Sequence, residues 1–138
     1  MNKPLEQAWA LLKEQELTCA VVCPDGRTLQ SKERGIKPVL DWLRQDAGAI
    51  RGASAADKVV GKAAAMLFVH GGIRELHTDV ISTPALAYLE EHHIPIAYET
   101  CVPHIINRDG TDMCPMEKRS LPLERPEDAF ALFDSIIP

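Results

Sequence analysis

The residues with the clearest chemical potential lie together in the stretch D-K-V-V-G-K, which follows the small residues of 52–56. We expect a strand over 52–56 to lead straight into a helix, with Asp57 as its N-cap, because a carboxylate there accepts from free backbone N–H groups. In an open α/β sheet, ligands bind in the crevice beyond the carboxyl ends of the strands. Asp57, Lys58, Gly61 and Lys62 therefore mark a site with two cations and close backbone access. The alternative is a simple cap, a packing glycine and solvated lysines.

A second candidate region is the run 101–120, which lacks a clear periodicity. A run of this length without secondary structure is uncommon in a compact domain and is typical of a functional segment or a partner contact. Asn107, Arg108 and Asp109 precede Gly110 in a sequence typical of a turn. We expect this turn to form a wall of the ligand pocket or a contact with a partner, and a plain surface turn is the alternative.

Cys114, in the same run, is the thiol best placed to act as a nucleophile. A reactive thiol needs its pKa lowered by nearby cations, and Arg108 and Lys118 are the near ones in the sequence. A buried and inert cysteine is the alternative. Cys101, His104 and Cys114 lack a fourth ligand and the paired spacing of a zinc site, so we expect no metal and no other cofactor.

The elements that must position these residues alternate along the chain. Periodicity and turn signals predict helices over 4–15, 36–45, 57–70, 84–93 and from 126, and strands over 18–24, 27–31, 52–56, 73–81 and 94–99. Asp25-Gly26 joins the first two strands as a hairpin. The later alternation predicts a mostly parallel sheet with right-handed crossovers, so the hairpin would be the one antiparallel pair. Ser82 and Thr83 lie at a strand end on the ligand side, where one or the other would cap the next helix.

The composition fits one domain of 138 residues, of which 46% are hydrophobic, with a net charge of -5. This acidic balance argues against a nucleic-acid partner, which needs a basic surface. No apolar run is long enough to span a bilayer, and the first residues do not form a signal peptide. Four cysteines without C-x-x-C spacing are typical of free thiols. We therefore expect a cytoplasmic protein with neither nucleic acid nor membrane as a partner.

Five stretches have a distinctive composition: T-C-A-V-V (18–22), R-G-I-K-P (34–38), A-D-K-V-V-G-K-A-A-A (56–65), V-I-S-x-P-A-L (80–86) and I-I-N-R-D-G-T-x-M-C-P-M-E (105–117). They resemble a small prokaryotic family known as domain of unknown function 1893, whose members have a cytidine-deaminase-like fold. The resemblance covers most of 4–118 and leaves the C-terminal helix outside. It implies a three-layer α/β/α sandwich with a five-stranded mixed sheet in a single domain, with a core over 1–118 and a C-terminal extension over 119–138.

True deaminases of that fold have a zinc site whose residues are missing from this sequence. Those enzymes hold zinc with three His or Cys ligands and move protons with a glutamate, arranged as H-x-E and P-C-x-x-C at two helix starts. By the order of elements, these starts fall here on 35–37 and 57–60, which contain no His, Cys or Glu. Zinc is not held by such residues. The resemblance therefore implies the fold without zinc-dependent deamination.

At the two helix starts that correspond to the zinc site of a deaminase, this sequence has cations. Arg34 and Lys37 flank Gly35 at one helix start, and Lys58 lies at the other. Both helix N-termini would point positive dipole ends at this place. We therefore expect a phosphate, pyrophosphate or carboxylate to bind there, with Asp57 holding a ribose hydroxyl or simply capping its helix.

Three functions are open from the sequence. The first is a protein that binds a nucleotide or other phosphorylated metabolite without zinc. In it, Arg34, Lys37 and Lys58 would hold the anion, and Asp57 and Asn107 would orient the rest of the ligand. The second is a homo-oligomeric or partner-binding scaffold with a vestigial pocket, in which the run 101–120 and the C-terminal helix make the contact. The third is an enzyme that uses Asp57 or Cys114.

Overall fold

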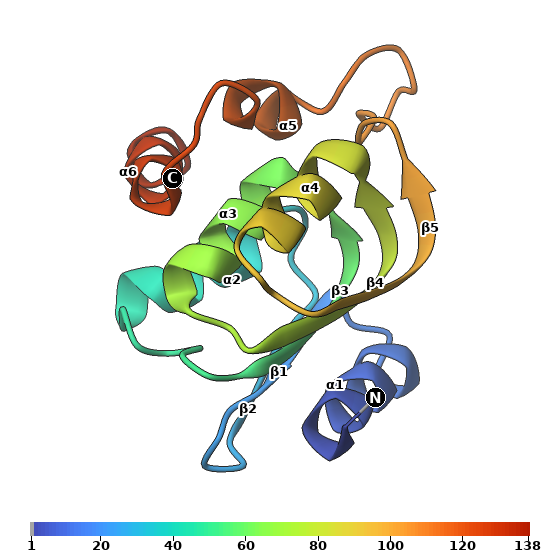
Figure 1. The fold of residues 1–138 in the computed structure, drawn as a ribbon, viewed down its shortest axis with the longest axis vertical. Coiled ribbons are helices and arrows are strands. Elements are labelled where there is room, and N and C mark those ends of the chain that lie inside the picture. The colour runs from blue at the N-terminus through green and yellow to red at the C-terminus, as the bar shows by residue number, and fades with distance from the viewer. Residues whose placement is uncertain (1) are drawn as a thin grey trace.

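Helices and strands alternate along most of the chain in the computed structural model, which describes residues 2–138 (Figure 1). The helices are α1 Lys3–Glu14, α2 Lys37–Gln45, α3 Lys62–Gly71, α4 Thr83–Glu91, α5 Pro115–Ser120 and α6 Pro126–Ile136. The strands are β1 Cys19–Val22, β2 Thr28–Ser31, β3 Ser54–Val60, β4 Glu75–Ser82 and β5 Ile96–Val102. Pro4, Pro38, Pro84 and Pro126 lie in first turns, where a missing N–H costs nothing, so these helix starts follow the sequence signals. None of the helices within 2–138 has the length and apolar character needed to cross a membrane.

Within the described residues the strands form one five-stranded mixed sheet in the order β2-β1-β3-β4-β5. β1 is antiparallel to both β2 and β3, while the pairs β3-β4 and β4-β5 are parallel. The expectation of a single antiparallel pair is therefore wrong. The chain crosses over β1 through α2, so β3 runs parallel to β2 and has to oppose β1, which lies between them.

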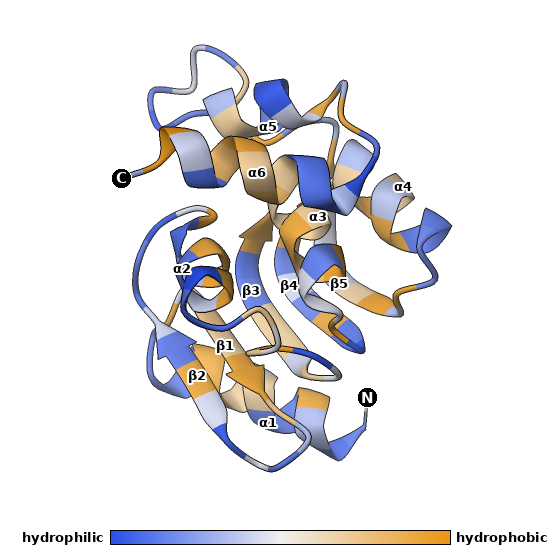
Figure 2. Ribbon diagram, turned by 90° about the vertical axis from the view of Figure 1, so that its left-hand side faces the viewer, coloured by the Kyte–Doolittle hydropathy of each residue, from blue (hydrophilic) through white to orange (hydrophobic). Residues whose placement is uncertain are grey.

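Helices cover both faces of this sheet. α1 packs against β1, β3 and β4 on one face, whereas α2, α3 and α4 lie on the other (Figure 1). The main core joins the sheet to α2, α3, α4 and α6, with Phe68, Leu40 and Phe133 fully buried, and a smaller cluster joins α1 to the other face. Hydrophobic residues gather between the layers, and α6 lies beside α3 (Figure 2). The α/β sandwich is thus confirmed, and α6 closes the fold by packing on α3 and α2.

The junction of β3 and α3 differs from the prediction. β3 continues to Val60, and the N-cap of α3 is Gly61 rather than Asp57, so the expected cap at Asp57 is wrong. Asp57 instead pairs with Cys19 on one side and Thr78 on the other. The ladder to β4 extends the strand, because it satisfies backbone groups that a helix start would leave open. The apolar run of α3 is buried, and the helix ends at Gly71, with Gly72 as its C-cap at a φ of 77°.

The run 101–120 is ordered by its own turn and by a short helix. The Oδ1 atom of Asn107 accepts hydrogen bonds from the backbone N–H groups of Thr111 and Asp112, and the N–H of Gly110 donates to the carbonyl of Asn107. This confirms the predicted turn. α5 then follows, and it begins with Pro115. The sequence reading missed α5, because its six residues are too few to show a helical period.

Candidate functional site

A cavity of about 660 Å³ lies at the junction of β3 and α3, where the run 105–117 passes the start of α2. Its walls come from segments far apart in the sequence: 32–36, 57–64 and 105–117, with Thr18 beside them. The strands β3 and β4 end on this side of the sheet (Figure 1). The predicted crevice beyond a carboxyl strand end is therefore present.

The cavity brings together most of the predicted site residues. Those that line it are Arg34, Gly35, Asp57, Lys58, Asn107 and Arg108, together with the candidate thiol Cys114. Lys37, Ser82 and Asp109 are not part of the lining. The ammonium group of Lys37 lies 3.1 Å from the carboxylate of Asp41. The hydroxyl of Ser82 is buried and accepts from the N–H of Ala85, which confirms its capping role, and Asp109 is exposed in the turn.

Four cations stand at this cavity without an acidic partner. They are Lys32, Arg34, Lys58 and Arg108, and within residues 2–138 none of them forms an ion pair. Their side chains are exposed, so they remain free to move onto a bound anion. Lys32 was not predicted as a site residue. It lies two residues from Arg34 in the same polar connection, and this spacing could have indicated that both reach the cavity. Lys62 does not contribute, because its ammonium group donates to the carbonyl of Leu121 at 2.8 Å.

Asp57 is a buried acid of the cavity, with 5% of its surface exposed. Burial raises the pKa of its carboxyl well above the usual value, and hydrogen bonding from the N–H groups of Lys58 and Val59 opposes this only in part. Burial also raises the pKa of the neighbouring Cys19 thiol, and the charge of Asp57 adds to that effect. Cys19 is therefore a core thiol, and the protonation of Asp57 depends on its burial.

The raised pKa of Asp57 gives a testable pH dependence. When folding raises the pKa of an acid, the native state holds the proton more tightly, so the free energy of unfolding falls as pH rises toward that value. Asp57→Asn stays neutral, so it should match the wild type below about pH 4 and exceed its stability at pH 8 by on the order of 1 kcal/mol. Urea denaturation across this range measures the difference. The exposed Asp109→Asn is the control, and a gap for Asp57→Asn that does not change with pH would contradict the assignment.

Glu117 is a site residue that the sequence did not reveal. Its carboxylate is buried, with 1% of the residue exposed, and it accepts from the N–H of Lys62 at 2.6 Å and from the N–H of Ile105 at 2.8 Å. A Cβ on Gly61 would lie 3.1 Å from its Oε1 atom, so glycine permits this close approach. The start of α3 is thus capped by an acid from α5. The expectation that both helix starts are open to a ligand is wrong for α3, whereas no side chain caps α2.

The two thiols and the histidine of the run 101–120 do not form a ligand set. Cys114 is half-buried at the cavity, whereas Cys101 is exposed and lies beside the hydroxyl of Thr83. Within the part of the chain described, no three His, Cys, Asp or Glu side chains are grouped so that they could hold a metal ion. The residues at the starts of α2 and α3 therefore do not fit the zinc of a deaminase.

Comparison with known proteins gives a family and a similar solved structure. The chain matches the family model "Domain of unknown function (DUF1893)" over residues 7–137. It is also similar to the crystal structure of a DUF1893 family protein from Thermotoga maritima, with 31% sequence identity and a TM-score of 0.87. That similarity covers 98% of this chain and 91% of the other. No curated protein matches the chain. The family match extends through α6 and therefore includes the C-terminal helix. The shorter resemblance over 4–118 had left this helix outside.

Proposed function

The chain belongs to the DUF1893 family, a domain of unknown function, and from the residues that line its cavity we propose that it binds a nucleotide or another phosphorylated metabolite without zinc. The observation that carries the proposal is the group of four unpaired cations at one cavity, in a protein whose net charge is -5. Cations gathered at one place in an acidic chain favour an anionic ligand, because each of them gains a partner only when that ligand is bound.

The chemistry of the four cations fits a phosphate group. Arg34 and Arg108 have planar guanidinium groups that can donate two parallel hydrogen bonds to phosphate oxygens, while Lys32 and Lys58 act as compact charges. The uncapped start of α2 adds partial positive charge beside Gly35. Cavities that bind small molecules typically have volumes of about 300–1,000 Å³. A volume of about 660 Å³ is therefore large enough for a nucleotide-sized compound.

The two polar residues predicted to orient the ligand have different capacities. Asp57 lines the cavity and can accept or donate, depending on its protonation, so it suits a ribose hydroxyl. The amide oxygen of Asn107 already accepts from two backbone N–H groups of its own turn. We therefore assign Asn107 to holding the turn that presents Arg108, rather than to direct contact with the ligand.

Calorimetric titration with inorganic phosphate, ribose 5-phosphate, AMP and ADP tests the proposal, with zinc as a separate arm. We expect at least one phosphate compound to bind and Arg34→Gln to weaken it by about tenfold or more, because a hydrogen bond to a charged group contributes about 1.5–3 kcal/mol. Arg74→Gln is the matched control, since Arg74 is exposed at the opposite end of the sheet and forms no ion pair within residues 2–138. Absence of binding by all four compounds, or equal losses in both variants, would overturn the proposal.

An enzyme is the second candidate, and the position of Asp57 favours it. A buried carboxyl with a raised pKa in a cavity is a common feature of acid–base sites, although structural groups also show it. Cys114 stays a prediction as a nucleophile. A homo-oligomer and a cytoplasmic location also stay predictions. Because α6 buries Ala129 and Phe133 in the core, a subunit contact through α6 would have to use its exposed side.

A further inference from the structure

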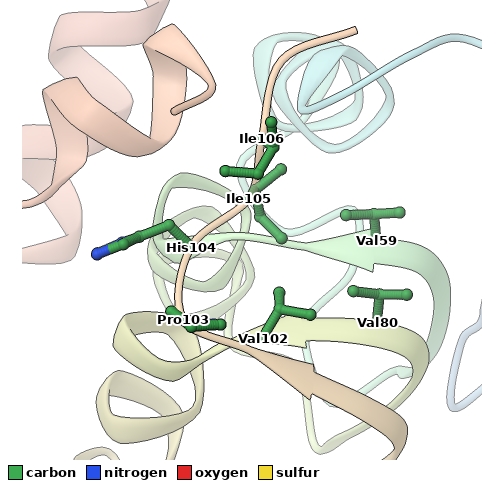
Figure 3. A pocket seen from close by; sticks show the side chains of 7 residues that line it. All are labelled: Val59, Val80, Val102, Pro103, His104, Ile105 and Ile106. Atoms are coloured by element: carbon green, nitrogen blue, oxygen red, sulfur yellow. The ribbon is translucent and has the colours of Figure 1, made fainter. Parts of the chain in front are cut away.

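An apolar hollow adjoins the cationic cavity. It measures about 500 Å³, and its apolar side chains come from the ends of three neighbouring strands and from the segment that follows β5 (Figure 3). We call this surface the apolar shelf; its residues are Val59, Val80, Val102, Ile105 and Ile106. His104 also borders the hollow, but its ring points away from the valines (Figure 3). The shelf therefore offers a ligand almost no hydrogen-bonding side chain.

The valines form a row because of the strand register. Val59 pairs with Val80, which pairs with Thr100, and Val102 lies two residues further along β5, on the same side as Thr100. The row is open to solvent: Val59 is 41% exposed, and Ile106 on the facing segment is 53% exposed. Exposed apolar side chains that gather beside a cavity mark a surface that a ligand or partner covers.

The shelf and the cationic cavity are continuous. Val59, Ile105 and Ile106 line both of them, and the four cations lie on the cavity's side of these shared residues. A ligand in the cavity that extends past Ile106 would leave the charged region and enter a surface of branched aliphatic side chains. One molecule that satisfies both surfaces must be anionic at one end and apolar at the other.

We propose, as an extension of the proposed function, that the ligand is a phosphate ester with an apolar group. Its phosphate lies among the cations, and its apolar group lies on the shelf. A planar ring such as a nucleobase and a short alkyl or acyl chain share this chemistry. A simple sugar phosphate does not, because its hydroxyl groups would lose water on the shelf without gaining hydrogen bonds there.

Calorimetric titration of the full chain with matched probes tests this inference. The probes fall into two classes: phenyl phosphate and AMP carry a ring, and hexyl phosphate carries a chain. We expect at least one class to bind about tenfold more tightly than ribose 5-phosphate and inorganic phosphate, since one buried apolar group adds an effect of this size. Tighter binding of the ring compounds would identify a planar group, and tighter binding of hexyl phosphate would identify a chain. Each result supports the bipartite ligand.

The decisive variant is Ile106→Ser. This exposed residue contributes little to the core, so the variant should fold. It should lower the affinity for the apolar ester much more than the affinity for inorganic phosphate, so that most of the preference between the two is lost. Ile136→Ser is the matched control, because Ile136 is 40% exposed on α6 and outside both hollows, and it should change neither affinity. Equal binding of all the phosphates, unaffected by Ile106→Ser, would overturn the shelf while leaving the anion site. Failure of every phosphate to bind would overturn both proposals.

Discussion

Replacing Phe133 by alanine lowers the free energy of unfolding by about 3–5 kcal/mol, the usual cost of removing a buried aromatic ring and leaving a cavity. Phe133 is fully buried in the core that joins α6 to α3 and the sheet. Protein cores are close-packed, so little relaxation into the space is expected. Urea denaturation at 25 °C measures the loss.

Phe130→Ala is the matched control on the same helix. Phe130 is half-buried and stacks on His70 with ring centroids 5.0 Å apart, so its removal should cost much less, about 1 kcal/mol. Equal losses for Phe130→Ala and Phe133→Ala would mean that α6 is not part of the core. The loss should also be independent of protein concentration. A dependence on concentration would indicate that α6 is stabilised by a second copy of the chain.

Helix starts could be read from the sequence because their signals are local. A proline in the first turn fixes φ wherever the rest of the chain lies, and Ser82 caps the helix that follows it directly. The end of β3 could not be read in this way. Lys58, Val59 and Val60 suit a strand as well as the start of a buried helix, and the pairing with β4 decides between them.

In the candidate site, too, local features could be predicted from the sequence and features that depend on tertiary packing could not. The cations of 34–58 were predicted because charge is visible in the sequence, and the ion pair that draws Lys37 away was also visible, since Asp41 follows it by four residues. The cap on α3 was not visible in the sequence. Glu117 is separated from Lys62 by 55 residues, and only the packing of α5 on α3 brings the two together. Sequence patterns locate charges, whereas tertiary packing determines which of them remain free.

Glu117→Ala tests this long-range cap and should lower the free energy of unfolding by about 3 kcal/mol, because two part-buried N–H groups lose a charged acceptor. The substitution also removes the negative charge of Glu117 from the positive end of α3. Glu117→Gln should fall between the alanine variant and the wild type. Its single amide oxygen can serve one of the two N–H groups, while its NH₂ group meets the other donor. Urea denaturation gives the three free energies.

Amide hydrogen exchange separates the cap from general packing. In Glu117→Ala the amides of Lys62 and Ile105 should lose protection more than those in the middle of α3, since these two groups donate directly to the carboxylate. Glu124→Ala is the control, because Glu124 is exposed, and it should stay within about 0.5 kcal/mol of the wild type. Unchanged protection at Lys62 and Ile105 would show that the carboxylate does not hold the two segments together. Loss at both would show that one acid from α5 joins the start of α3 to the wall that carries Ile106 and Arg108.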